Sequence, residues 1–311
     1  MATLTATRPG QFRKKQRNAV AMGVLFALPW IIGFLVFQLY PILASIYYSF
    51  TYYNLFSEPE WIGLENFRAI FEDDKFYKSM FNTLYMTVFG VPLGLAFALL
   101  CALALNTESR LQPLYRALVY LPTIVPVVAA TYLWRWILNA QYGYLNSILN
   151  RLGLPEPLWT EDAPWTKPAL LLIGLWTVGG TTIIFLAALK EVPRSYYEAA
   201  MIDGAGAWSR FWNITWPAIS PVTLFQLVIG VLGGLQYFTQ AYLFAQERMN
   251  TASGGPEDSI LMYGMYIFHN AFVYLDMGYA SALAWLLFIA SMAVTAVILL
   301  FAKKWVHYEG D

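Results

Sequence analysis

The stretch 82–105, "NTLYMTVFGVPLGLAFALLCALAL", contains no charged side chain. An apolar run of about 20 residues is long enough to cross the hydrocarbon core of a bilayer as a helix. Five further runs have this character, at 19–48, 114–138, 168–189, 218–245 and 280–302. The composition agrees, because 59% of the 311 residues are hydrophobic and only 12% are charged. We therefore expect an all-α integral membrane protein with six transmembrane helices, rather than a soluble protein with six buried helices.

The basic residues are distributed unevenly between the two sides that six spans would create. One side would carry both ends of the chain and the second and fourth loops, and it would hold 12 of the 19 Lys and Arg residues. These are Arg8, Arg13, Lys14, Lys15, Arg17, Arg110, Arg116, Lys190, Arg194, Arg210, Lys303 and Lys304. The positive-inside rule makes this side cytoplasmic. We expect a basic cytoplasmic tail at 1–18, a transmembrane domain at 19–304 and a cytoplasmic tail at 305–311.

The first apolar run is much longer than the apolar core of a cleaved signal peptide, so we interpret it as a retained anchor. The outer loops are rich in aromatic and charged residues. Loop 49–81 is expected to hold short interfacial helices, and loop 139–167 carries three prolines. In loop 246–279 the segment 260–272, "ILMYGMYIFHNAF", is amphipathic but too short to span.

The sequence offers little chemistry. The single cysteine, Cys101, lies inside an apolar run, the two histidines are far apart, and no Gly-Lys pair occurs that would mark a phosphate-binding loop. We expect no catalytic residue, no metal, no bound cofactor and no nucleic-acid partner. Energy for any vectorial work must then come from an ion gradient or from another subunit. An ion-driven transporter normally carries a buried acid inside a span, and none of the six runs has an interior Asp or Glu.

A more polar segment, 196–221, "YYEAAMIDGAGAWSRFWNITWPAISP", interrupts the apolar sequence between the fourth and fifth runs. Its first part is rich in helix formers, and Gly204 and Gly206 can end that helix through a left-handed residue. "WSRFWNITW" reads as a second helix. Two short helices that meet at a glycine would form a projecting knob. The alternative is an amphipathic connector that lies on the membrane.

The residues of this segment resemble a known signature. Glu-Ala-Ala at 198–200, Asp-Gly-Ala at 203–205, and Ile214 followed by Trp-Pro at 216–217 are similar to the EAA loop of ABC importer permeases, with Trp216 where Leu is usual. The runs "LPWIIGFLVFQLYPILASIYYSFT" (28–51), "WIGLENF" (61–67), "GGP" (254–256) and "GYASALAW" (278–285) resemble the MalF-like permeases of carbohydrate importers.

This resemblance implies a type I ABC importer permease fold in a prokaryotic inner membrane, with loop 190–217 as the coupling loop. The residues that it assigns to docking on an ATPase are Glu198, Ala199, Ala200, Asp203 and Gly204. The implied partners are a MalG-like second permease, two ATPase subunits that bind ATP and Mg, and an extracytoplasmic binding protein. The chain itself would not be an enzyme. The implied substrate is a di- or oligosaccharide, with glycerol phosphate or a polyol as the alternative.

Polar and aromatic residues inside spans are the candidates for a sugar site. The resemblance favours parts of the fourth and fifth spans, and the candidates there are Trp176, Thr177, Gly180, Thr181, Gly233, Gln236, Tyr237 and Gln240. The spacing of 233, 237 and 240 would put them on one face of a continuous helix. Matching family positions also fall on Gly230 and Gly234. Gln240 is expected to meet the Tyr237 hydroxyl when no sugar is bound. The alternative is that the glycines are close-packing positions between helices.

Overall fold

The computed structural model describes residues 9–107, 109–245 and 254–307, with side chains from Met22 onward. Its α-helices are α1 (Pro9–Phe34), α2 (Tyr40–Ser49), α3 (Glu65–Phe71), α4 (Asp74–Tyr85), α5 (Val91–Leu105), α6 (Gln112–Ile124), α7 (Val127–Ile137), α8 (Tyr144–Arg151), α9 (Ala163–Trp176), α10 (Gly179–Glu191), α11 (Arg194–Ile202), α12 (Ala207–Arg210), α13 (Trp216–Leu235), α14 (Thr239–Ala245), α15 (Tyr263–Phe268) and α16 (Met277–Ala302). Wider or tighter helical turns join several of them, namely η1 (Leu35–Leu39), η2 (Met86–Gly90), η3 (Phe211–Thr215), η4 (Pro256–Asp258) and η5 (His269–Val273). Two short strands, β1 (Thr51–Tyr52) and β2 (Glu60–Trp61), pair antiparallel.

Four helices in the described part of the chain are long and apolar enough to cross a membrane: Met22–Ser49, Asp74–Leu105, Ala207–Ala245 and Met277–Ala302. Two bent helix pairs have the same apolar character, and the total reaches six if each pair forms one span. The expectation of an all-α membrane protein is therefore confirmed. The basic segment expected as a tail is partly helical, because α1 already begins at Pro9.

The third expected span, 114–138, is not one straight helix, because α6 and α7 meet at a 98° bend. The cause is local. Pro126 has no N–H to continue the helical ladder, and a residue before proline avoids the helical region. Val125 accordingly takes an extended ψ of 127°.

The fourth and fifth expected spans are interrupted more gently. Between α9 and α10 the axis turns by 48° at Thr177–Val178. The fifth span continues from α13 into α14 across the non-helical residues Gln236–Phe238. The prediction that Gly233, Tyr237 and Gln240 share a face of one continuous helix is therefore wrong, because α13 ends at Leu235 before Tyr237 is reached.

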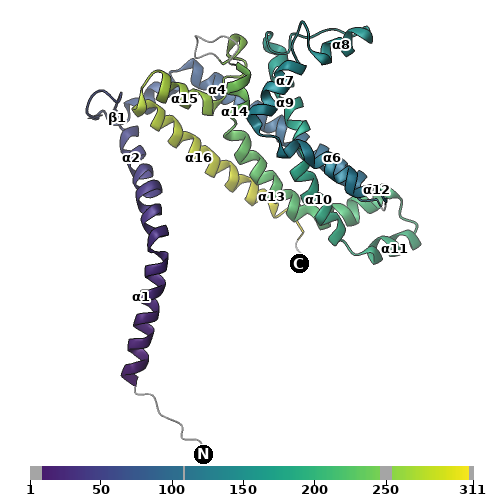
Figure 1. Cartoon of the computed structure of the whole chain (residues 1–311), viewed down its shortest axis with the longest axis horizontal. Coiled ribbons are helices and arrows are strands. Elements are labelled where there is room, and N and C mark those ends of the chain that lie inside the picture. The colour runs from purple at the N-terminus through teal and green to yellow at the C-terminus, as the bar shows by residue number, and fades with distance from the viewer. Residues whose placement is uncertain (1–8, 108, 246–253, 308–311) are drawn as a thin grey trace, which may run out of the picture.

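The two ends of the molecule are distinct in Figure 1, which has β1, α8 and α15 along its upper side and α11 and the C-terminus along its lower side. The first span forms a rod that stands apart from the other helices, and only its upper part, α2, packs closely on α16. The Trp285 indole N–H donates to Ser45 Oγ at 3.1 Å across this contact. From Met22 onward, most large apolar side chains of α1 are exposed, as expected for a helix that faces lipid or another subunit.

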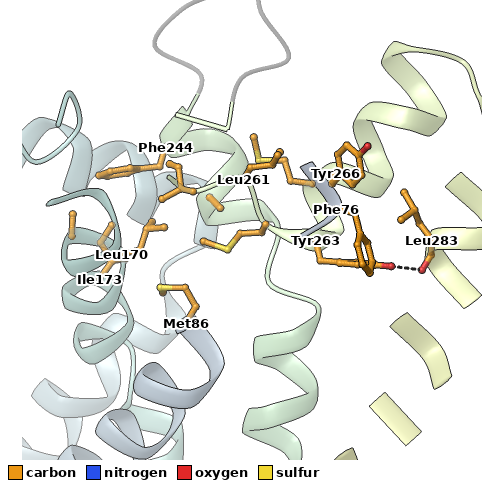
Figure 2. Close-up of a cluster of buried hydrophobic side chains, with 14 of the residues drawn as sticks. Phe76, Met86, Leu170, Ile173, Phe244, Leu261, Tyr263, Tyr266 and Leu283 are labelled. Carbon is orange, nitrogen blue, oxygen red and sulfur yellow. Dashed lines mark hydrogen bonds between the residues drawn. The ribbon is translucent and has the colours of Figure 1, made fainter. Parts of the chain in front are cut away.

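The core divides into clusters. The largest joins α4, α9, α14, α15 and α16, and its centre includes Phe76, Leu170, Phe244, Leu261 and Tyr263 (Figure 2). A second joins α5, α10 and α13 around Ala98, Phe185, Leu189 and Ile219. The first cluster lies toward the upper side of Figure 1 and the second toward the lower side. The cavity described next lies between elements of both clusters.

Polar contacts fasten the upper loops to the spans. Asn82 donates to the carbonyl oxygens of Asp258 and Leu261 at 2.8 and 3.0 Å, and Tyr263 N–H donates to Thr83 Oγ1 at 2.8 Å. The expected helices in loop 49–81 are present as α3 and the start of α4. The segment 260–272 is helical from Tyr263 and is largely buried, so it belongs to the core rather than to a surface.

Candidate functional site

A cavity of about 360 Å³ lies between the middle parts of three spans. This volume falls at the small end of the range for small-molecule pockets, about 300–1,000 Å³. Its walls come from η2 and α5, from α9 and α10, and from α13 with the residues after it. Most of the lining is aliphatic, and the polar side chains in it are Thr177, Thr181, Gln226, Tyr237 and Gln240. A mostly apolar cavity with a few convergent polar groups is the usual form of a binding site.

Tyr237 is the most informative of these residues. It lies in the non-helical step between α13 and α14, and its N–H donates to the Gly234 carbonyl at 3.2 Å. Its hydroxyl oxygen is buried and has no hydrogen-bond partner among the described residues. The predicted contact with Gln240 is therefore wrong for this structure, although both residues line the same cavity. A buried hydroxyl without a partner costs about 1–3 kcal/mol, so a ligand that offered this hydroxyl a hydrogen bond would gain affinity from it.

The glycines of α13 divide into two kinds. A Cβ atom at Gly230 would lie 2.8 Å from Val91 Cγ1, and one at Gly234 would lie 2.7 Å from Thr87 Oγ1 and 3.2 Å from Thr87 Cα. These two glycines, four residues apart, let α13 approach η2 and α5 closely. A Cβ at Gly233 would meet nothing within 4 Å. The packing interpretation thus describes Gly230 and Gly234, whereas Gly233 leaves open space at the cavity wall.

The candidates of the fourth span also differ in whether they line the cavity. Thr177 and Thr181 line the cavity, and Thr177 also lines a second cavity of about 420 Å³ at the bend between α6 and α7, together with Gln240. Trp176 is not in the lining of either and packs edge-on against Trp134, with ring centroids 5.9 Å apart. Gly180 faces α6, since a Cβ there would lie 3.6 Å from Thr123 Cγ2.

Gln236 differs from its neighbours, because its side chain is exposed and absent from both cavity linings. Of the eight candidates, the structure brings together Thr177, Thr181, Gly233, Tyr237 and Gln240. Sequence reasoning missed Gln226, which is 7% exposed and lines the cavity. A signal was available, since Gln226 lies seven residues before Gly233 and so on the same face of α13.

Loop 190–217 folds as two short helices around a glycine. Helix α11 ends at Ile202, and Gly204 takes a φ of +79°. The Ala205 N–H donates to the Ala200 carbonyl at 2.8 Å, and the Gly204 N–H donates to the Met201 carbonyl at 3.1 Å. This pair of bonds is the Schellman motif, which needs a left-handed residue at the position of Gly204. The predicted helix end at Gly204 is confirmed, while Gly206, with φ −69°, instead precedes α12.

Helix α11 projects from the lower side of the molecule in Figure 1. Glu198, Ala199 and Asp203 are exposed on it, and Ala200 is half-buried. Ile202 is 87% exposed, which is unusual for a large apolar side chain with no partner covering it. The Tyr197 hydroxyl lies 3.0 Å from Thr215 Oγ1 and fixes α11 to η3. A small, exposed, partly apolar helix is thus held at a defined angle to the fifth span.

On the upper side, Asp73 joins three elements. Asp73 directly precedes α4, and its carboxylate accepts the Lys75 N–H at 2.8 Å. It also accepts a hydrogen bond from the hydroxyl of Tyr266 in α15 and one, at 2.8 Å, from the hydroxyl of Tyr279 near the start of α16. Burial acts to raise the pKa of this carboxyl, but the two tyrosine hydroxyls and the backbone N–H groups outweigh it and hold the pKa below its usual range. The ionised Asp73 carboxylate therefore links the start of the second span to the sixth span through hydrogen bonds.

Comparison with known proteins decides the family. Residues 90–307 match the family model described as "Binding-protein-dependent transport system inner membrane component". The chain belongs to this family. It is a transport permease subunit with several membrane helices, and the import permease expected from the sequence is confirmed.

Relatives of this permease span nearly its whole length. It is 41% identical to the "Probable ABC transporter permease protein YesP" of Bacillus subtilis (strain 168), over 93% of this chain and 92% of that protein. It is 35% identical to the "Sulfoquinovosyl glycerol transport system permease protein SmoG" of Agrobacterium fabrum, over 89% of each chain. The resemblance to carbohydrate-importer permeases is thereby confirmed at the level of the family.

The fold of the permease also matches a solved structure. A crystal structure of a bacterial ABC transporter involved in the import of the acidic polysaccharide alginate superposes with a TM-score of 0.76, over 94% of this chain and 98% of that one. The sequence identity is 22%, so this likeness supports the fold alone. The 98° bend and the broken spans therefore occur within a chain whose overall architecture is that of an importer permease.

Proposed function

We propose that this permease translocates a sugar, held at the cavity beside Tyr237, in an importer whose ATP hydrolysis takes place on partner subunits. The observation that carries the proposal is the buried Tyr237 hydroxyl without a partner in a cavity that also presents Thr177, Thr181 and Gln240. An aromatic ring suits the apolar face of a sugar, and hydroxyl and amide groups suit its hydroxyls. Relatives named for sulfoquinovosyl glycerol and lactose support a carbohydrate substrate.

Glycerol phosphate or a polyol is the second candidate substrate. The cavity lining contains no Lys or Arg, which a phosphate ester would favour. A di- or oligosaccharide therefore fits this chain's contribution better than a phosphate ester, with a second permease completing the site.

The proposed assembly contains a MalG-like second permease, two ATPase subunits that bind ATP and Mg, and an extracytoplasmic binding protein. The family description names dependence on a binding protein, which supports the last of these. Each bent helix pair would form one span, for six in all, with both termini in the cytoplasm because the basic residues favour that side. Uptake of sugar by this chain alone, in vesicles without ATP, would contradict this assembly.

Loop 190–217 is proposed as the mechanical contact with the ATPase. Small residues Ala199 and Ala200 permit close approach, Glu198 offers a charge to a basic group, and Gly204 fixes the angle between the two helices. Movement of the ATPase would pass through α11 and the Tyr197–Thr215 contact into the fifth span, which carries the cavity wall. Alternating access then follows from different contacts of the loop in each state.

The test of the site is Tyr237→Ala in the reconstituted importer. We expect weaker sugar uptake, with assembly and basal ATP hydrolysis retained. Uptake, thermal stability and basal ATP hydrolysis are measured on one preparation, with Gln236→Ala as the matched control because that neighbouring side chain is exposed outside the cavity. If Tyr237→Ala lowers stability while each folded complex transports with unchanged apparent affinity and rate, Tyr237 only packs between helices and the site is wrong.

A further inference from the structure

Lys167 lies half-buried on a helix that lines the cavity. It belongs to the first part of α9, and Leu171 and Gly174, four and seven residues later on the same face, line the cavity. Lys167 is therefore about one helical turn, roughly 5 Å, from that lining, toward the start of α9. The hydroxyl of the adjacent Thr166 lies 2.8 Å from Ser259 Oγ, just after η4, so this end of α9 belongs to the upper side of the molecule.

Two aromatic rings of α4 face this lysine. Its ammonium nitrogen lies 5.2 Å from the ring centroids of both Phe81 and Tyr85. Tyr85 directly precedes Met86, which lines the cavity, and Tyr85 and Tyr237 both pack against the core cluster that contains Met86. Phe81 is 61% exposed. Aromatic rings at the edge of a cavity can pack against the apolar face of a sugar.

The positive charge at this edge has no counter-ion in the described part of the chain. The Lys167 ammonium carries three N–H donors, yet it donates no hydrogen bond to a described residue and forms no ion pair with one. Lys78 lies on the same face of α4, three residues before Phe81, and its charge adds to that of Lys167. A half-buried ammonium beside two rings and a second cation favours an anion from outside the chain.

We propose that Lys167 binds the carboxylate or sulfonate group of an acidic saccharide, with one sugar ring against Tyr85 and a further ring in the cavity. This inference rests on the proposed function and specifies its substrate class. The cavity lining holds no Lys or Arg, so the acidic group lies at this edge while another ring reaches Tyr237. Glycerol phosphate offers an anion but no ring to the two aromatic side chains.

The test measures equilibrium binding to the assembled importer, with its ATPase partners made unable to hydrolyse ATP and with no binding protein added. The probes are disaccharides of galacturonic, glucuronic and mannuronic acid, each beside its methyl ester, which keeps the rings and removes the charge. We expect the wild type to prefer at least one acid over its ester, and high salt to narrow that preference. Lys167→Gln should weaken binding of the acid roughly tenfold, the low end for a hydrogen bond to a charged group, and leave the ester unchanged.

Three variants serve as comparisons. Lys167→Arg keeps the charge and should keep the preference for the acid. Lys75→Gln is the matched control, because Lys75 is exposed one turn before Lys78 in α4 and loses the same charge. Tyr237→Ala separates this inference from the proposed function. Unchanged binding of both probes by Tyr237→Ala would contradict the proposed function, whereas weaker binding in that variant, with no preference for the acid in the wild type, would contradict the charge assignment alone.

The proposal is overturned if no acidic disaccharide binds, if acid and ester bind equally, or if Lys167→Gln weakens both alike. Lower retention of phosphatidylglycerol by Lys167→Gln, with the preference for the acid unchanged, would identify a lipid site instead. Loss of the second permease from that variant, again with the preference unchanged, would identify a protein contact and equally refute the proposal. If Lys167→Gln does not assemble, Lys167→Arg and the salt dependence of the wild type decide the question, and a preference that high salt leaves unchanged refutes the ion pair.

Discussion

Replacement of Tyr237 by Phe should have opposite effects on stability and on transport. The hydroxyl is buried without a partner in the described structure, so its removal relieves a cost of about 1–3 kcal/mol. Tyr237→Phe should therefore make the empty permease more stable by an amount in that range. The same change removes one hydrogen bond to the sugar, worth about 0.5–1.5 kcal/mol, or roughly 2- to 12-fold in apparent affinity.

The assay compares thermal unfolding of the purified importer with the concentration dependence of sugar uptake in liposomes. Tyr263→Phe is the matched control, because the Tyr263 hydroxyl donates to the Leu283 carbonyl at 2.9 Å within the core (Figure 2). That variant removes a buried hydrogen bond that is already made in the folded protein, and it should lose about 1 kcal/mol.

The reasoning depends on the sign of the two effects. A loss of stability in Tyr237→Phe as large as that in Tyr263→Phe would mean that the Tyr237 hydroxyl has a partner in the empty protein. A gain in stability with unchanged sugar affinity would mean that the hydroxyl is unpaired but does not meet the sugar. Either result refutes the role assigned to this residue.

Three further predictions follow from the described contacts. Gly204→Ala should cost about 1 kcal/mol because of its φ of +79°, and should lower uptake per ATP hydrolysed, whereas Gly206→Ala should change neither, as measured by uptake beside ATP hydrolysis. Asp73→Asn should cost about 1.5 kcal/mol at pH 7, at the low end for hydrogen bonds to a charged group because the carboxylate is part-buried. Since the folded pKa of Asp73 is lowered, its contribution is present above about pH 4 and disappears as the pH falls through the folded pKa; thermal melts from pH 3 to 7 should therefore show a smaller acid loss in the variant. Gly234→Val should cost about 1–3 kcal/mol through overpacking against Thr87, with normal stability of Gly233→Ala as the comparison, and equal melting temperatures would disprove the close approach.

The sequence predicts the membrane class because apolar length is a direct physical requirement for crossing a bilayer. It also predicts the helix end at Gly204, since few residues other than glycine adopt a left-handed conformation easily. The bend at Val125–Pro126 carried a proline signal that the apolar run concealed. The step at Gln236–Phe238 has no comparable signal, because the chain there contains neither proline nor glycine.

The candidate site was likewise predicted in part from the sequence. Residue type identified Thr177, Thr181, Tyr237 and Gln240 as unusual within spans, and all four line the cavity. The type of a residue does not reveal which way it faces within a span. Whether Gly180 faces the cavity or α6 depends on the 48° turn at Thr177–Val178. The different environments of Gly233 and Gly234 likewise depend on how closely α13 approaches η2, which is a property of packing.

The most direct test of the central claim is sugar retention by the assembled importer when the cavity is filled from Gly233. A Cβ there meets nothing within 4 Å, so Gly233→Trp can extend a ring into the cavity without displacing the backbone of a neighbouring helix. With the ATPase partners made unable to hydrolyse ATP, equilibrium binding of the transported sugar is measured alongside thermal stability. We predict that Gly233→Trp lowers sugar retention more than tenfold at normal stability, whereas Gly233→Ala retains the sugar. Unchanged retention in a stable Gly233→Trp importer would contradict the assignment of this cavity as the place where the sugar is held.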